Sequence, residues 1–192
     1  ATADISEIHS MAMEFFIWPH LDALYSPEDV EKYKFFHMKN ALAFLPYGAA
    51  VDEFQTEVYD NPNMTPAGRL TLWKSLEKRY LPWRKYKSEG FLTEGRAWQR
   101  QTHIYKWPFY YIDYALAQVC ALQFHFMNEA NHDRAWDSYL RLLRGSGFQS
   151  FDETLALAGL ASPFAPGVLE KVGRQAMEFL EKDRWWHGGA FD

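Results

Sequence analysis

The sequence predicts an all-α protein, and three observations support this fold class. Several segments place apolar residues three and four positions apart, the periodicity of a helix that buries one face. Helix start signals precede these segments, with Ser, Thr or Asn at the cap and often Pro or acidic residues directly after. No stretch alternates apolar and polar residues as a half-buried strand would, and no internal repeat occurs.

The composition indicates one globular domain over residues 1–192. A chain of 192 residues suits a single core, and 48% hydrophobic and 18% aromatic residues supply it. The net charge of -5, with both signs interspersed, argues against a nucleic-acid partner. Cys120 is the single cysteine, so no disulfide can form within the chain, which favours a cytoplasmic location. No signal peptide is visible, and no apolar run reaches the roughly 20 residues that cross a bilayer, so no membrane partner is expected.

The first helix is expected from about Asp4, with apolar residues at helical spacing, and Pro19 closes it. Glu7 and Glu14 share one face, because an offset of seven returns to the same side of a helix. His9 falls nearer the apolar face. A lone histidine there is interpreted as a core residue with satisfied hydrogen bonds.

Three more segments follow in the first half. Ser26 with Pro27 predicts a helix to about Leu45, an interruption at residues 46–48, and a helical continuation over residues 49–59. Asp52, Glu53 and Glu57 in the continuation could bind a metal, but a solvated or salt-bridged face is favoured. Thr65 begins a helix through Tyr80. Residues 82–108 lack periodicity and are interpreted as a functional, mobile segment.

Residues 101–118 combine one histidine with four tyrosines. His103 is expected in a loop ahead of Pro108, and residues 109–126 are expected to form a long buried helix. Tyr111 and Tyr114 then lie on one face, three residues apart. Two interpretations stay open. The imidazole and phenols could donate hydrogen bonds to an oxyanion, or the rings could form a core whose hydroxyls bond to backbone carbonyls.

The last third predicts three helices. Asn131 can cap the first, Ser150 and Glu153 match a capping box ahead of the second, and the third covers about residues 166–180. The tail beyond lacks a pattern, and His187 is expected to be an exposed terminal residue.

Three stretches carry a resemblance to a known family: EIHSMAMEFF at residues 7–16, ALAFLPYGAAVDEFQTEVYDNP at residues 41–62, and WQRQTHIYKWPFYYIDYALAQVCALQF at residues 98–124. They resemble the C-terminal part of oligoendopeptidases F, in the thimet oligopeptidase-like family of zinc metallopeptidases. The resemblance implies the multi-helix C-terminal portion of a zincin-type catalytic domain. It covers most of the chain in the family's order.

The resemblance also implies residue roles. The family's zinc is held by two histidines of an HExxH helix and by a glutamate that matches Glu7. A histidine and tyrosines that bind substrate and stabilise the tetrahedral intermediate match His103, Tyr111 and Tyr114. Tyr110 is a weaker candidate, since it should point away if Tyr111 faces the metal. Helical phase adds Glu14, which could orient a zinc ligand.

One departure limits these implications. The seven histidines are His9, His20, His37, His103, His125, His132 and His187, and none begins an HExxH. The family places this motif shortly upstream of the glutamate. One carboxylate cannot hold zinc tightly, so we expect the chain alone to be inactive. It could be a truncated piece, one chain of a split enzyme, or a relic.

The favoured interpretation is the C-terminal part of a zinc metalloendopeptidase that hydrolyses short peptides. Its partners would be peptide substrates and an HExxH-bearing segment of the same enzyme or of a companion chain. An incomplete core should expose an apolar face, through which copies of the chain could also associate. The alternative is a non-catalytic helical module, derived from such a peptidase, that binds peptides or another protein.

Overall fold

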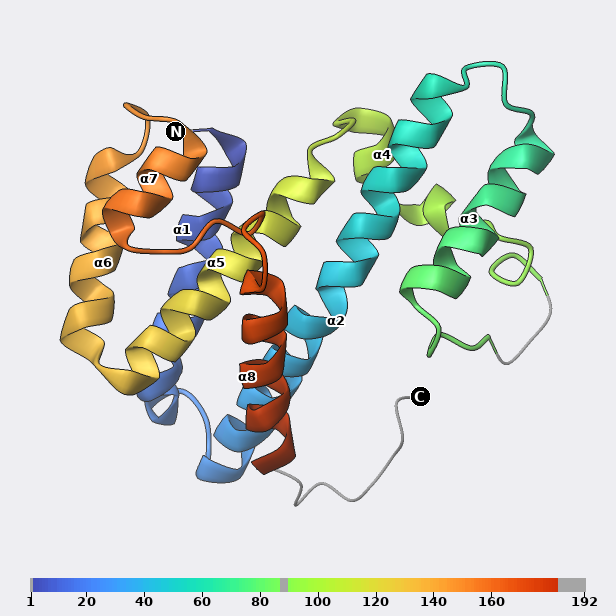
Figure 1. The fold of residues 1–192 in the computed structure, drawn as a ribbon. Coiled ribbons are helices and arrows are strands. Elements are labelled where there is room, and N and C mark those ends of the chain that lie inside the picture. The colour runs from blue at the N-terminus through green and yellow to red at the C-terminus, as the bar shows by residue number, and fades with distance from the viewer. Residues whose placement is uncertain (1, 87–89, 183–192) are drawn as a thin grey trace. The chain divides into compact units, whose positions relative to one another are not determined.

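A computed structural model describes residues 2–86 and 90–182, and within them the regular structure is helical, without a strand (Figure 1). The all-α prediction is therefore confirmed. The α-helices are α1 (Ala3–Phe16), α2 (Pro27–Asp60), α3 (Pro66–Tyr80), α4 (Thr102–Lys106), α5 (Tyr111–Ala130), α6 (His132–Gly145), α7 (Phe151–Ala158) and α8 (Val168–Lys182). Two 3-10 helices, η1 (Trp18–Ala23) and η2 (Ala97–Arg100), complete the set.

The described residues fall into two compact units. Unit 1 comprises residues 2–42 and 116–182, and unit 2 comprises residues 43–86 and 90–115. Helices α2 and α5 each contribute one end to each unit. The single domain over residues 1–192 stays a prediction. Along the described chain, no helix combines the length and apolar character that a membrane span requires.

Predicted helix caps are present where the sequence placed them. The Thr65 hydroxyl accepts from the Gly68 N–H at 3.1 Å, and the Asn131 Oδ1 accepts from the Arg134 N–H at 2.9 Å. Ser150 and Glu153 form both halves of a capping box at α7. Each cap satisfies a backbone donor that a helix start otherwise leaves without a partner.

Three predicted boundaries are wrong. Helix α2 continues through Pro46, although proline removes one backbone hydrogen bond, because burial of flanking side chains such as Leu45 and Val51 holds the helix together. Helix α5 begins at Tyr111 and not at 109, since Phe109 has a φ of 64°, which no right-handed helix accepts. The supposedly irregular stretch 82–108 contains α4 and η2.

Unit 1 closes around apolar faces of α1 and α5. Ile8 and Ala12 on α1, and Leu122 and Phe124 on α5, are fully buried. Figure 1 shows α6, α7 and α8 around these two helices. His9 bonds through Nδ1 to the Tyr139 hydroxyl at 3.2 Å and through Nε2 to the Ser146 hydroxyl at 3.0 Å. The prediction that His9 has satisfied hydrogen bonds is confirmed, although its side chain is half-buried and not fully within the core.

His125 on α5 is a second buried histidine, and it lies in an aromatic cage. Its ring centroid is 4.9 Å from Phe15, 4.5 Å from Trp18 and 6.1 Å from Phe179. Its side chain is 1% exposed, and neither ring nitrogen has a hydrogen-bond partner among the described residues. Burial, helped by positive charge on His37 and Lys34, lowers the pKa of His125 to about 4.

We therefore predict that His125 weakens unit 1 in acid. The ordinary pKa of histidine is 6.5, and the pKa of His125 in the folded chain is about 4. Between these pH values His125 is protonated in the unfolded chain and neutral in the folded chain. The free energy of unfolding should fall by about 3 kcal/mol as pH drops through this window. Urea unfolding at several pH values should show a flatter profile for His125→Leu. An equally steep profile in the variant would contradict the assignment.

Unit 2 is built around α2 and α3. Its core comprises Val51 and Phe54 on α2, Trp73 and Leu76 on α3, and Trp98 on η2. The chain before η2 approaches α3 at Gly95, where φ is +83° and an added Cβ would overlap the Leu70 carbonyl oxygen. This contact anchors the segment that leads into α4.

Gly95→Ala should therefore destabilise unit 2 by about 2–4 kcal/mol. A left-handed backbone costs an L-residue about 1–2 kcal/mol, and the overlap with a carbonyl oxygen adds to that cost. Gly159, with a φ of +73° and open space around its Cβ position, gives the matched control. Gly159→Ala should show only the backbone cost in chemical denaturation. Equal losses of stability in the two variants would mean that α3 moves away from the added Cβ without cost, and would contradict the prediction.

Candidate active site

Four aromatic rings surround the imidazole of His103 in unit 2. The ring centroids of Trp107, Tyr110, Tyr111 and Tyr114 lie 5.7, 6.3, 5.0 and 5.7 Å from that of His103. His103 belongs to helix α4, so its predicted loop position is wrong. The bias that proline imposes on its predecessor affects only Trp107, which follows the last residue of α4 with non-helical angles, φ -141° and ψ 71°.

The three consecutive positions 109–111 turn the chain from α4 into α5 and bring the tyrosines together. Tyr111 and Tyr114 lie on the first turn of α5, with ring centroids 5.7 Å apart. Tyr110 precedes the helix. Its ring is nearly parallel to that of His103 and lies 5.1 Å from that of Tyr114. Tyr110 therefore does not point away from the cluster. The prediction that it would do so assumed that Tyr110 lies within the helix, whereas α5 begins at Tyr111.

A hydrogen-bond chain orients His103. The Tyr47 hydroxyl donates to Gln101 Oε1 at 2.8 Å, and Gln101 Nε2 bonds to His103 Nδ1 at 2.8 Å. An amide nitrogen only donates, so Nδ1 is the acceptor and the neutral imidazole carries its proton on Nε2. Sequence reasoning missed Tyr47 and Gln101. The signal was weak, since Tyr47 lies in a supposed helix break.

Burial raises the pKa of two tyrosines, Tyr111 and Tyr47. Loss of solvent, with smaller effects of the Tyr47 and Tyr114 hydroxyls, raises the pKa of Tyr111 far above its ordinary value of 10. Burial likewise raises the pKa of Tyr47. Edge-to-face contacts with Tyr47 and Phe44, at 5.8 and 5.6 Å, hold the Tyr111 ring. At neutral pH the Tyr47 and Tyr111 hydroxyls are therefore hydrogen-bond donors.

The predicted metal ligand lies in unit 1. Glu7 is half-buried on α1, and its Oε2 accepts from the Ser10 hydroxyl at 3.1 Å. Glu14 is two turns further along α1 and accepts from His37 Nε2 at 3.2 Å, while His37 Nδ1 accepts from Trp18. The observed contact of Glu14 is thus with α2. Its role in orienting a zinc ligand stays a prediction.

The described residues do not form a complete zinc site. Among them, no group of three His, Cys, Asp or Glu side chains is placed to hold a metal ion. Among the acidic residues of α2, Glu53 accepts from the Tyr80 hydroxyl at 2.6 Å and pairs with Arg79, and both contacts lower its pKa. The salt-bridged interpretation is therefore confirmed for Glu53. His187 lies outside the described residues.

Comparison with known proteins decides the family. Residues 1–174 match Peptidase family M3, which is nearly the whole chain. The chain belongs to this family. Its members are zinc-dependent peptidases, so the resemblance seen in the sequence is confirmed. No match was found among curated proteins.

Solved structures of M3 peptidases have the same fold. The chain is 48% identical to PZ peptidase A bound to an inhibitor, with a TM-score of 0.90, over 95% of this chain and 32% of that one. A structure described as an oligoendopeptidase F has 50% identity and a TM-score of 0.90, over 94% and 32%. A Bacillus anthracis protein described likewise has 42% identity and a TM-score of 0.78, over 95% and 29%. The chain thus spans about a third of these proteins and matches their C-terminal portion.

The orientation of His103 gives a direct prediction. Gln101→Glu replaces the donor at Nδ1 with an acceptor, so the proton of the neutral imidazole should move to Nδ1. The ring ¹⁵N chemical shifts of His103 should exchange their pyrrole-like and pyridine-like values. Gln99→Glu, which alters a half-buried residue on η2 beside the cluster, should leave them unchanged. An unaltered pattern in Gln101→Glu would show that Gln101 does not set the tautomer.

Proposed function

We propose that this chain supplies the C-terminal part of the active site of a zinc metalloendopeptidase that cleaves short peptides. The observation that carries the proposal is the hydrogen-bonded chain from Tyr47 through Gln101 to His103, which leaves the Nε2–H of a ring packed among tyrosine rings as a donor. Family membership provides the reaction class. Glu7 is the residue that we propose as the zinc ligand of this chain.

The proposed chemistry follows from what the cluster can donate. Peptide hydrolysis passes through a tetrahedral intermediate whose former carbonyl oxygen is negative. Nε2–H of His103 and the hydroxyls of Tyr111 and Tyr114 are donors that would bind this oxygen or the neighbouring peptide groups. They are held before substrate arrives, because ring contacts and Gln101 fix them, and fixed donors need no rearrangement during the reaction.

The proposal assigns the remaining components to an HExxH-bearing segment in the same enzyme or a companion chain. Zinc, when bound, polarises the substrate carbonyl and lowers the pKa of its water. Without that segment the chain should be inactive. Large exposed side chains on unit 1, such as Phe148 and Phe164, support cover by another segment or copy. The buried, free Cys120 supports a reducing compartment such as the cytoplasm.

The alternative is that the chain is a non-catalytic binding module, and this alternative predicts the opposite results for the same variants. Such a module would bind peptides without metal, and Glu7→Gln would leave binding unchanged. No observation favours it specifically. Peptide binding alone does not require an imidazole of fixed orientation, such as His103, packed against the rings of Tyr111 and Tyr114.

Reconstitution tests the proposal. Mixing the chain with an HExxH-bearing segment of an M3 relative should give zinc-dependent cleavage of a short fluorogenic peptide. His103→Ala and Tyr111→Phe should each lower kcat about 10²–10³-fold, since removing one oxyanion donor costs this much. Glu7→Gln should abolish the zinc-dependent cleavage by weakening metal binding.

Matched controls separate chemistry from folding. Glu57→Gln removes an exposed carboxylate on α2, and Tyr59→Phe keeps the ring that contacts Phe109, so both should retain full activity. Helical circular dichroism of all variants should agree. Cleavage that survives Glu7→Gln and His103→Ala together would rule the proposal out.

A further inference from the structure

Unit 1 contains a pocket that none of the proposed active-site residues lines. It has a volume of about 370 Å³ and is formed by the end of α5, the start of α6, the segment before α8 and the first half of α8. Its apolar lining includes Phe126, Met127, Val168 and Val172. Gln123 braces the far wall, since its side chain both donates to and accepts from the backbone of Ala161, each at 2.9 Å.

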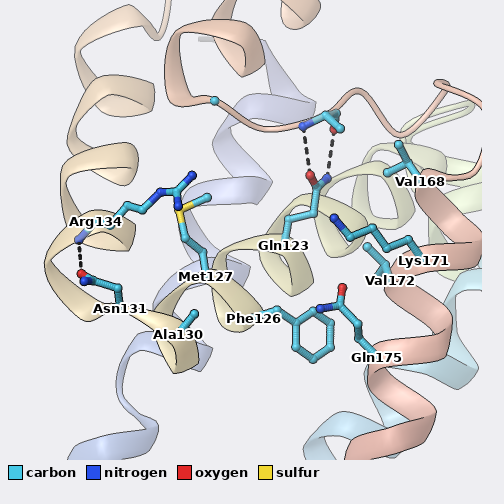
Figure 2. A pocket seen from close by; sticks show the side chains of 12 residues that line it. Gln123, Phe126, Met127, Ala130, Asn131, Arg134, Val168, Lys171, Val172 and Gln175 are labelled. Atoms are coloured by element: carbon cyan, nitrogen blue, oxygen red, sulfur yellow. Dashed lines mark hydrogen bonds between the residues drawn. The ribbon is translucent and has the colours of Figure 1, made fainter.

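Two cations reach into this pocket from opposite sides. Figure 2 shows the guanidinium of Arg134 extending from α6 and the ammonium of Lys171 extending from α8, with Met127 and Phe126 of α5 between these two helices. In the part of the chain that the structure describes, neither cation has a carboxylate partner. Arg174 of α8, which does not line the pocket, is paired with Glu170.

The pocket also offers polar groups without partners. The Gln175 side chain is half-buried in the wall and makes no hydrogen bond to another described residue. The Asn131 Oδ1 caps α6, which leaves its amide N–H₂ group available at the rim. An amide side chain can both donate to and accept from a peptide group.

We propose that this pocket binds the C-terminal end of a short peptide whose last residue is apolar. Arg134 and Lys171 bind the free α-carboxylate, the apolar lining takes the last side chain, and Gln175 bonds to the preceding peptide group. Two cations beside a hydrocarbon surface favour an anion with an apolar portion over a small inorganic ion, because only such an anion uses both the charges and the apolar lining. The volume is at the low end for ligand pockets and suits a di- or tripeptide better than a long acyl chain.

Methyl NMR tests the proposal on the whole chain, with methionine methyl groups labelled with ¹³C and a chelator present to prevent hydrolysis. N-acetyl-leucyl-leucine should shift the Met127 methyl signal in a saturable way. The same peptide with a C-terminal amide should bind about tenfold more weakly, because it loses a charge-assisted hydrogen bond. Met38, fully buried in unit 1, and Met177, exposed on α8, should not shift.

Variants identify the binding groups. Arg134→Gln and Lys171→Gln should each weaken acid binding about tenfold and abolish the preference for acid over amide. Arg174→Gln makes the same charge change on α8 outside the pocket and should change affinity less than twofold. Equal binding of acid and amide, no Met127 shift at millimolar peptide, or equal losses in Arg174→Gln would each overturn the proposal.

These outcomes are separate from those of the proposed peptidase function. Peptide bound at the His103 cluster would leave Met127 unshifted, and binding at the pocket survives Glu7→Gln and His103→Ala. A decanoate titration distinguishes a fatty acid from a peptide terminus. Decanoate that shifts Met127 more strongly than the peptide acid would overturn the assignment of the ligand.

Discussion

The hydrogen bond from Gln101 to His103 is the constraint on which the candidate site depends. An imidazole has two nitrogens that can exchange roles, and one amide N–H settles which of them donates. Tyr47 fixes that amide from α2, and the same tyrosine packs its ring against Tyr111. Tyr47 of α2 thus helps to set both the tautomer of His103 in α4 and the position of the Tyr111 ring in α5. The core of unit 2 therefore determines the chemistry available at its surface.

The two units serve this arrangement in different ways. Unit 2 holds its cluster through aromatic contacts around Trp73 and Trp98, which are stiff because interiors are closely packed. Unit 1 carries Glu7 on a helix whose other face is fully buried, so the position of its carboxylate along α1 is set by the core.

Much of this could be predicted from the sequence, but only where the deciding interactions are local. Caps at Thr65, Asn131 and Ser150 involve residues three positions apart, and each was predictable. The continuity of α2 through Pro46 depends on burial that distant residues supply. The partner of His103 is Gln101, and Gln101 is held in turn by Tyr47, a contact across 54 residues that no spacing rule reveals. The roles of Glu7, His103, Tyr111 and Tyr114 came from family resemblance and not from periodicity.

The left-handed backbone of Phe109 has a consequence for how changes spread through unit 2. A φ of 64° is costly for a bulky side chain, so this joint between α4 and α5 holds conformational energy and persists only while its surroundings restrain it. One restraint is Gln55, 1% exposed within α2, whose Oε1 accepts from the Phe109 N–H at 3.3 Å. Another is Tyr59, whose ring contacts that of Phe109. Loss of the Gln55 amide or of the Tyr59 ring would release the joint and rotate the tyrosines that follow it, without altering any group that touches a substrate.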